Sequence, residues 1–203
     1  MKNVIIIGAG GHAKIIADIV LCSGDAVLGF LDDKPDLPPE ICGIPVLGKV
    51  EDHVKYPDAE YVIGIGNAAV RRKVAGMLKG VRFYTAIHPD AVVSSLDVTI
   101  GEGTVIMANA VVNPGTRIGA HCIVNTAAVV EHDNKIGDYS HVSVGAKLAG
   151  TVSIGEETWV GIGAVVSNNL RICGGCMIGA GAVVIRSIDD PGTYAGVPAR
   201  RIS

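Results

Sequence analysis

A histidine followed directly by an aspartate, His132-Asp133, is the pair best suited to chemistry in this chain of 203 residues. A neutral imidazole can take a proton from an attacking group, and a neighbouring carboxylate stabilises the imidazolium that forms and can fix the ring tautomer. The pair therefore predicts a general base. A solvated histidine with an incidental acidic neighbour is the alternative, and the pair alone does not exclude it.

A glycine-rich turn near the N-terminus is the second candidate site. The apolar run Val4–Ile7 precedes the turn Gly8–Ala13, and apolar residues then recur at helical spacing as far as Cys22. The backbone amides of such a turn can approach a phosphate at a helix N-terminus. The pair Asp32-Asp33, about twenty residues further on, stands where an acid binds a sugar hydroxyl. An ordinary strand–helix turn without a ligand has the same pattern.

The second half of the chain repeats every six residues, and this repeat must position His132. From Ile100 to Val184 every sixth residue is isoleucine, leucine or valine, and a small residue mostly follows four positions later. Such a period fits neither a helix nor an alternating strand. It predicts short parallel strands joined by corners, three to each turn of a triangular coil. Ile100–Asp189 would form five coils of 18 residues without an inserted loop, and His88–Val98 an irregular sixth. His132 and Asp133 would lie on a corner, away from the packed interior.

The first part of the chain predicts a small parallel sheet with helices on its faces. We expect strands at Val4–Ile7, Ala26–Leu31, Glu60–Ile65 and Val81–Ala86, and helices at Ala13–Cys22 and Ala68–Leu78. This unit is about half the size of a dinucleotide-binding fold, which argues against an NAD dehydrogenase and favours a mononucleotide such as that of an activated sugar. We therefore divide the chain into a Rossmann-like domain at residues 1–87 and a β-helix at residues 88–203.

Composition excludes several classes of protein. The net charge is −3 without a cluster of Lys and Arg, and only 4% of the residues are aromatic, so nucleic acid is an unsuitable partner. No apolar run approaches the roughly 18 residues that span a bilayer, so no membrane partner is expected. Five cysteines, an odd number, are typical of free thiols in a reducing compartment, and we expect a cytoplasmic protein.

The cysteine and histidine spacing does not favour a metal site. Cys173 and Cys176 form the only closely spaced cysteine pair, and Cys176 occupies a small inward position of the repeat. A zinc site usually needs further ligands at a comparable spacing. We therefore expect neither a metal nor a redox role for this pair.

Taken together, these motifs resemble those of a known enzyme family. The chain resembles the hexapeptide-repeat nucleotide-sugar N-acetyltransferases of the bacillosamine and perosamine type, which are grouped with sialic acid O-acetyltransferases. The likeness runs from Val4 to Arg200 and rests on the motifs Gly10-Gly11-His12, Leu31-Asp32-Asp33-Lys34, Ile65-Gly66-Asn67, Ile87-His88-Pro89, Glu131-His132-Asp133, Ser140-His141-Val142-Ser143 and Gly196-Val197-Pro198-Ala199-Arg200. It implies a left-handed parallel β-helix, acetyl-CoA as co-substrate, and a homotrimer with active sites in the clefts between prisms.

The resemblance also implies roles for individual residues. It makes His132 the catalytic base, Asp133 the acid that raises its basicity, and the backbone amide of Gly150 the oxyanion donor. The family's contacts with acetyl-CoA correspond to His141, Ile162 and Ala180. Its contacts with the nucleotide sugar fall on Gly10, Gly11, His12, Asp32, Asp33 and Gly66.

The implied reaction is direct transfer of an acetyl group from acetyl-CoA to the amine of a UDP- or GDP-linked amino sugar, with a UDP-4-amino-4,6-dideoxy sugar favoured and no metal required. Two alternatives keep the fold. A hydroxyl could replace the amine, as in the sialic acid O-acetyltransferases, because general-base chemistry would use the same residues. The second alternative is a trimer that binds nucleotide sugars and catalyses no reaction.

Overall fold

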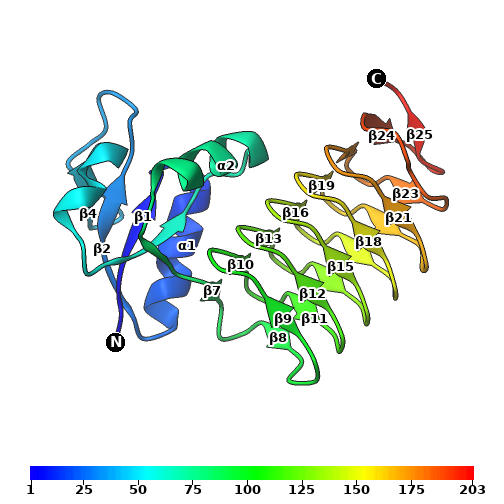
Figure 1. The fold of residues 1–203 in the computed structure, drawn as a ribbon, viewed down its shortest axis with the longest axis horizontal. Helices are drawn as coiled ribbons and strands as arrows, with labels where there is room; N and C mark the ends of the chain where they lie inside the picture. Colours follow the sequence, from blue (N-terminus) through cyan, green and yellow to red (C-terminus); the bar gives the residue numbers. More distant parts are fainter.

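The structure, a computed structural model, describes residues 1–203 as an α/β unit joined to a three-sided prism of short strands. In Figure 1 the α/β unit lies on the left and the coils of the prism stack towards the C-terminus on the right. This architecture confirms the predicted fold class, a Rossmann-like half domain followed by a β-helix of hexapeptide repeats. No helix has the length and apolar character needed to cross a bilayer.

The α/β unit is a six-stranded sheet with strand order β3-β4-β2-β1-β5-β6. Its elements are β1 (Asn3–Ile7), α1 (Gly11–Cys22), β2 (Ala26–Leu31), β3 (Glu40–Ile41), β4 (Ile44–Gly48), the 3₁₀-helix η1 (Val50–Lys55), β5 (Glu60–Ile63), α2 (Ala68–Met77) and β6 (Arg82–Phe83). All neighbours are parallel except β3 and β4, which form an antiparallel hairpin. The predicted strands and helices from Val4 to Leu78 are present within a few residues. The hairpin and η1 were not predicted.

The predicted strand Val81–Ala86 is wrong as a single element. Its first part is β6, which pairs with β5, whereas Ala86 starts β7 (Ala86–Ile87), which pairs with β10 of the prism. Tyr84 and Thr85 lie between the two strands. The strand pairing of the prism thus begins two residues before residue 88.

The three faces of the prism differ in what they present to their surroundings. The domain face contains β7, β10 (Val105–Ile106), β13 (Ile123–Val124), β16 (His141–Val142), β19 (Trp159–Val160), β22 (Met177–Ile178), β24 (Thr193–Ala195) and β25 (Arg200–Arg201). The valine face contains β8 (Val92–Val93), β11 (Val111–Val112), β14 (Val129–Val130), β17 (Lys147–Leu148), β20 (Val165–Val166) and β23 (Val183–Val184). The polar face contains β9 (Thr99–Ile100), β12 (Arg117–Ile118), β15 (Lys135–Ile136), β18 (Ser153–Ile154) and β21 (Arg171–Ile172).

The interior of the prism follows the hexad pattern. The second residue of each two-residue strand points inward, and of the fifteen predicted aliphatic positions only Ile100 is not fully buried. Strand partners such as Ile118 and Ile136 are 18 residues apart, and this register holds without a slip through the five predicted coils. An additional first coil precedes them. Its β8 pairs with β11 one residue out of this period, which confirms the predicted irregular coil.

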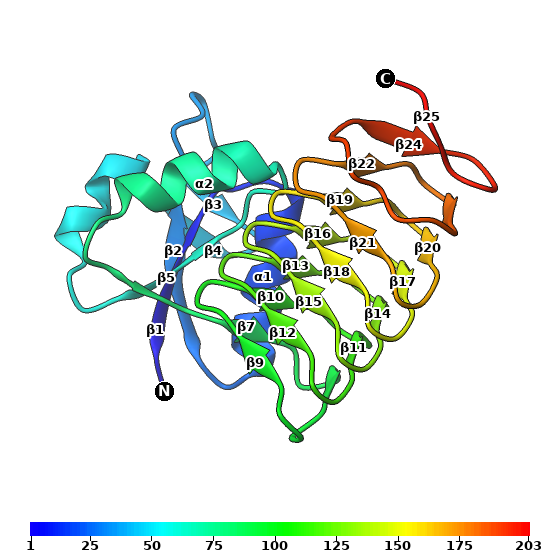
Figure 2. The same cartoon turned by 45° about the vertical axis from the view of Figure 1, so that its right-hand side comes forward.

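The α/β unit and the prism share one apolar core. Helix α1 lies between the sheet and the first coils in both ribbon views (Figures 1 and 2). Its residues Ile16 and Ile19 belong to the same buried cluster as Val105, Met107 and Ile123 of the prism. The first three coils of the domain face are therefore covered, and the later coils leave room for a cavity beside α2.

Candidate active site

His132 and Asp133 lie on the corner between the valine face and the polar face, directly after β14. Their side chains are 58% and 64% exposed, and Nδ1 of His132 lies 2.8 Å from Oδ2 of Asp133. This hydrogen bond places a proton on Nδ1 and leaves the lone pair of Nε2 free to accept one. Asp133 has a φ of 59°, a left-handed conformation that aspartate tolerates better than most residues. The pair therefore has the geometry of a general base with its orienting acid.

Two glycines on the same corner, one coil before and one coil after, make room for the pair. A Cβ atom on Gly150 would lie 2.4 Å from Nε2 of His132, and a Cβ atom on Gly115 would lie 2.4 Å from Oδ1 of Asp133. Any side chain at either position would displace the pair. The amide N–H of Gly150 makes no hydrogen bond within the chain, so it is free to donate beside the imidazole. The sequence did not single out Gly115, although a glycine one coil before the acid was the available signal.

His141 lies elsewhere, in β16 on the domain face, and is only 6% exposed. Its Nε2 atom is 2.9 Å from Nδ2 of Asn125, and its ring stacks on Trp159 with the centroids 5.0 Å apart. The ring of His12 lies 6.4 Å from it, between centroids. One buried ring nitrogen of His141 and one of His12 have no partner. Trp159, to which no chemistry could be assigned from the sequence, thus belongs to the same cluster.

A cavity of about 240 Å³ lies between the start of α2 and the later coils of the domain face. Gly66 and Asn67 line it on one side, and His141, Trp159 and Met177 line it on the other. A predicted sugar contact, Gly66, and a predicted coenzyme contact, His141, therefore share one cavity. The structure brings His12 close to it through its ring contact with His141.

The other predicted sugar contacts surround the start of α1. Gly10 and Gly11 are exposed there, and no side chain caps the helix, so its first amides are open to a ligand. Asp32 accepts hydrogen bonds from the backbone N–H groups of Ala9 at 2.7 Å and Lys34 at 2.8 Å. Asp33 accepts one from Val50 at 3.0 Å. These acids hold the glycine turn and η1 in place, which is a structural role that the sequence did not predict.

Ile162 and Ala180 lie on the corner between the domain face and the valine face. Ile162 is 58% exposed, and its carbonyl accepts the N–H of Gly181 at 2.8 Å, which stacks the two corners one coil apart. Val144, also exposed, is one coil earlier. This apolar column, Val144-Ile162-Ala180, flanks one edge of the valine face, and His132 flanks the other. Within one chain, the candidate base and these coenzyme contacts are therefore not brought together.

The cysteine pair packs as the repeat predicts. Cys176 is buried, its Sγ atom is 3.4 Å from that of Cys173, and burial together with this neighbour raises the pKa of Cys176 to about 12. A separate group, Asp18, Cys22 and His88, brings donor atoms within 4.8 Å of one another. Its histidine already accepts the N–H of Asp90 through Nδ1 at 3.0 Å, and none of the three lines the cavity beside α2.

A prism of hexapeptide repeats with an exposed histidine–aspartate pair on one corner defines the class of hexapeptide-repeat acyltransferases. Residues 3–78 match the family model of the PglD N-terminal domain, and residues 97–132 match that of the bacterial transferase hexapeptide, six repeats. A curated relative is the UDP-N-acetylbacillosamine N-acetyltransferase of Bacillus subtilis (strain 168), which is 46% identical over 114 residues. That match spans 53% of this chain and 52% of the relative, about half of each.

Solved structures extend the similarity to the whole chain. The acetyltransferase domain of PglB from Neisseria gonorrhoeae FA1090 is 36% identical, with a TM-score of 0.93 and full coverage of both chains. The same domain in complex with acetyl coenzyme A has a TM-score of 0.94 and covers 99% of both chains. PerB from Caulobacter crescentus, in complex with CoA and GDP-perosamine, is 35% identical, covers 100% of this chain and 98% of its own, and has a TM-score of 0.93. The chain belongs to this family of nucleotide-sugar N-acetyltransferases built on a left-handed β-helix.

Two buried histidines, His121 and His141, and the partly buried His12 have pKa values below the ordinary range. Burial, with a contribution from the charge of Arg71, lowers the pKa of His12 and of His121 to about 4. Burial, His12 and Arg71 lower the pKa of His141 to about 3. All three are neutral at pH 7, and the ordinary histidine pKa is about 6.5.

We therefore predict that stability falls as the pH drops below about 6.5, because the unfolded chain takes up protons that the folded chain refuses. Each such histidine adds a slope of about 1.4 kcal/mol per pH unit to the free energy of unfolding. Denaturant titrations between pH 7 and pH 5, above the carboxylate range, measure this slope. His121→Phe removes one of the three histidines, so it should reduce this slope by about 1.4 kcal/mol per pH unit. A free energy of unfolding that does not change between pH 7 and pH 5 would contradict the prediction.

Proposed function

We propose that this chain is an acetyl-CoA-dependent N-acetyltransferase that acetylates the amino group of a nucleotide-linked amino sugar, with His132 as the general base. The observation that carries the proposal is the hydrogen-bonded His132-Asp133 pair, with a free Nε2 beside the unpaired amide of Gly150. It occurs in a chain similar over its full length to structures solved with acetyl-CoA and with CoA and GDP-perosamine.

These groups supply each step of a direct transfer. Nε2 of His132 removes a proton from the sugar amine as its nitrogen attacks the thioester carbon of acetyl-CoA. Asp133 stabilises the imidazolium, and the N–H of Gly150 donates to the oxyanion of the tetrahedral intermediate. When the intermediate collapses, the C–S bond breaks and the CoA thiolate takes the proton from His132. Holding both substrates in one cleft provides the proximity that the reaction needs.

We further propose that the site is completed in a homotrimer. The outward residues of the valine face are apolar apart from Lys147, and include Val92, Val111, Val129, Val165 and Val183. The polar face instead presents residues such as Arg117 and Lys135. An uncovered apolar face of this kind is typical of an interface between subunits. Packing three valine faces around one axis would bring the His132 corner of one chain to the Val144-Ile162-Ala180 column of the next, which joins the two groups of site residues.

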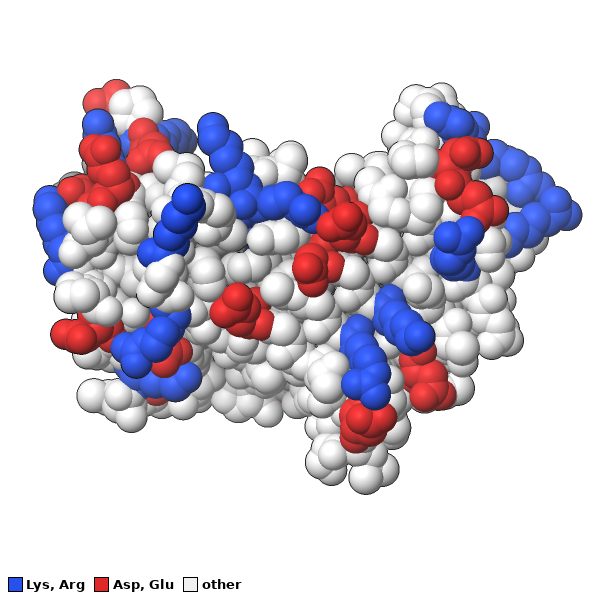
Figure 3. Space-filling view, viewed as in Figure 1, with Lys and Arg blue, Asp and Glu red and all other residues white.

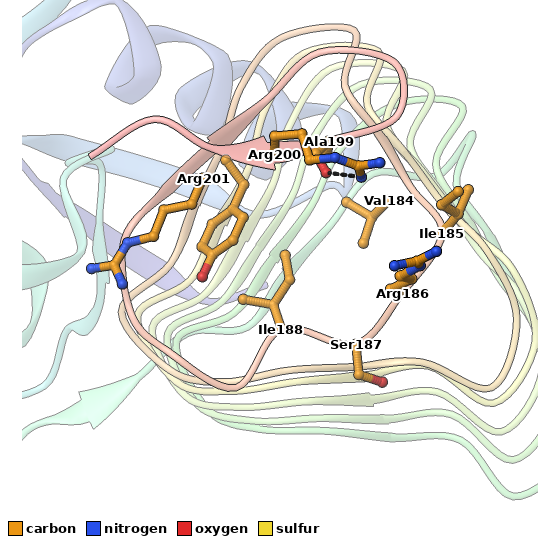
Figure 4. Close-up of a pocket in the computed structure, with 9 residues that line it drawn as sticks. Val184, Ile185, Arg186, Ser187, Ile188, Ala199, Arg200 and Arg201 are labelled. Carbon is orange, nitrogen blue, oxygen red and sulfur yellow. Dashed lines mark hydrogen bonds between the residues drawn. The ribbon is translucent and has the colours of Figure 1, made fainter.

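A cavity at the C-terminal end of the prism supports a phosphorylated co-substrate. It has a volume of about 140 Å³, an apolar floor that includes Val184 and Ile188, and a rim that includes Arg186 and Arg200. Figure 4 shows these two arginines on the same side of the cavity, whereas Arg201 points away from it. Neither Arg186 nor Arg200 forms an ion pair with a carboxylate, and basic side chains gather at this end of the molecule (Figure 3).

Arg186 occupies the corner column of His132, three coils further along the prism. At a spacing of about 4.8 Å per coil, the two residues are roughly 14 Å apart along the axis. The phosphates of acetyl-CoA lie at the opposite end of the molecule from its thioester, at a comparable distance. An acetyl group held at His132 would therefore place the phosphates near Arg186 and Arg200.

We predict that Arg186→Gln raises the KM for acetyl-CoA about tenfold at low salt, because a charge-assisted hydrogen bond to phosphate is lost. The KM for the sugar nucleotide should stay within about twofold, and the effect should shrink at high ionic strength. Steady-state thiol-release assays measure both constants. Lys135→Gln, an exposed change on the polar face, is the matched control. Equal KM values for acetyl-CoA in Arg186→Gln and wild type would refute this role.

For the acceptor, we propose a UDP-linked 4-amino-4,6-dideoxy sugar rather than a GDP-linked one. The support is that the relative named for a UDP-linked sugar is 46% identical over 114 residues, about half of this chain, whereas the relative solved with GDP-perosamine is 35% identical over the whole chain. The name of the first relative specifies a UDP-linked N-acetylated amino sugar. The second relative was solved with a GDP-linked amino sugar.

The test is release of the CoA thiol from acetyl-CoA in the presence of a panel of UDP- and GDP-linked 4-amino sugars, with free sialic acid as a further acceptor. We predict turnover with an amino sugar, and a loss of about 10²–10⁴-fold in His132→Ala because the general base is removed. Wild-type turnover in His132→Ala would refute the assigned base. Turnover with sialic acid alone would indicate the O-acetyltransferase, and binding of the panel without turnover would indicate the non-catalytic trimer.

A further inference from the structure

Arg71, in the first turn of α2, is only 1% exposed, and no carboxylate pairs with it. Its guanidinium donates only to backbone carbonyl oxygens. Nε donates to His121 at 2.8 Å, one Nη donates to both Ile65 and Gly66 at 2.9 Å, and the other donates to Tyr139. Burial lowers its pKa to about 10, so it remains charged at neutral pH. A buried charge held by four carbonyl groups and no acid is uncommon, because desolvation is costly.

The four acceptors explain why this residue is an arginine. They come from three separate places, namely the loop after β5 and the corners of two successive coils. The planar guanidinium presents five N–H groups in a fixed fan, whereas the ammonium of lysine is a single centre with three. Only the fan can reach all four oxygens at once. The hydrogen bonds of Arg71 therefore hold these three segments in a fixed arrangement and do not neutralise a negative charge.

The segments that Arg71 joins are the two walls of the cavity beside α2. Gly66, whose carbonyl it binds, lines that cavity from the α/β unit. Tyr139, whose carbonyl it also binds, is two residues before His141, which lines the cavity from the prism. One guanidinium thus holds both walls, and the width of the cavity depends on it.

The adjacent Arg72 joins the same two units by a different kind of contact. It is exposed, pairs with Glu156 and Glu157 on a later corner, and lies 4.6 Å from the centroid of the Tyr139 ring. It makes no hydrogen bond to the Gly66 loop or to the carbonyl groups that Arg71 binds, although its partner Glu157 lines the cavity. Exposed ion pairs of this kind add little to stability. Arg72 therefore provides a control that removes an ion-pair contact between the two units and keeps the hydrogen bonds to the Gly66 loop.

We propose that Arg71 is a positioning residue that sets the distance between the Gly66 loop and the His141–Trp159 wall, and thereby the affinity for the nucleotide-linked sugar. This inference rests on the proposed function for its substrate, but its geometric part does not. Replacement of Arg71 by lysine keeps the positive charge but removes the planar set of five N–H donors. The loop would then lose at least one of its two anchoring hydrogen bonds, and the sugar site would loosen, while the Ile162–Ala180 part of the predicted acetyl-CoA site would not.

The experiment compares Arg71→Lys and Arg71→Met with Arg72→Gln, each assayed well below its own melting temperature. We expect both Arg71 variants to raise the KM for the sugar nucleotide about tenfold or more, since the loop loses hydrogen bonds donated by a charged group. The KM for acetyl-CoA should rise less, because of its three predicted contacts only His141 lines this cavity, and Arg72→Gln should resemble wild type in both constants. Equal increases in the two KM values, or a lower melting temperature with unchanged KM values, would overturn the proposal.

A second readout does not depend on catalysis. Hydrogen–deuterium exchange should be faster across residues 64–70 in both Arg71 variants and unchanged in Arg72→Gln, because the side chain of Arg71 binds the carbonyl groups of that loop and the side chain of Arg72 does not. If wild type acetylates no sugar but the exchange result holds, the proposed function fails and the positioning role survives. Unchanged exchange in the Arg71 variants, or failure of both to fold, would overturn the positioning role.

Discussion

The register of 18 residues per coil is the constraint on which the rest of this molecule depends. Each coil forms backbone hydrogen bonds to the next at the same six-residue phase, so residues 18 apart stand directly above one another. A residue inserted within a strand would exchange the inward and outward positions that follow it in that strand, because the two alternate along each strand. The register holds from Ile100 onward. The columns on the corners are therefore straight, and a residue's chemistry is fixed by its corner and its coil.

The candidate active site follows from these columns. His132 has space only because Gly150 follows it by one coil, and Asp133 has space only because Gly115 precedes it by one. Arg186 shares their corner at the C-terminal end. The apolar column on the opposite edge of the valine face contains Ile162. Because a rigid prism cannot bend one edge towards the other, a site that needs both edges has to be assembled from two chains.

Much of this arrangement could be predicted from the sequence, because a narrow interior accepts only aliphatic and small residues at fixed intervals. That constraint fixed the number of coils, the inward positions and the corner that carries His132. The β3–β4 hairpin escaped prediction because β3 has only two residues and Pro45 interrupts the apolar pattern of β4. The break between β6 and β7 was not predicted because Val81–Ala86 is apolar enough for a single strand. Only the pairing partners, β5 and β10, show that the segment forms two strands.

The parts of the site that escaped prediction depend on contacts between distant segments. Nothing in the sequence of α2 distinguishes Arg71, which is buried against carbonyl groups, from Arg72, which is exposed and ion-paired. The burial of His141 beneath Trp159 depends on two coils and a neighbouring helix. The motifs that resemble the family predict the glycine turn and its two acids as sugar contacts, whereas the hydrogen bonds from Ala9 and Lys34 show that Asp32 holds that turn.

The most direct measurement of a site shared between chains is complementation between two inactive variants. His132→Ala lacks the base, and Ile162→Asp places a charge in the apolar column on the opposite edge. In the proposed trimer, co-expression in equal amounts gives mixed assemblies in which some sites take an intact base from one chain and an intact column from its neighbour. Random mixing then restores about a quarter of the wild-type activity in a cyclic assembly with two chains per site. Activity no higher than that of the two variants purified separately would contradict the shared site and place the reaction within a single chain.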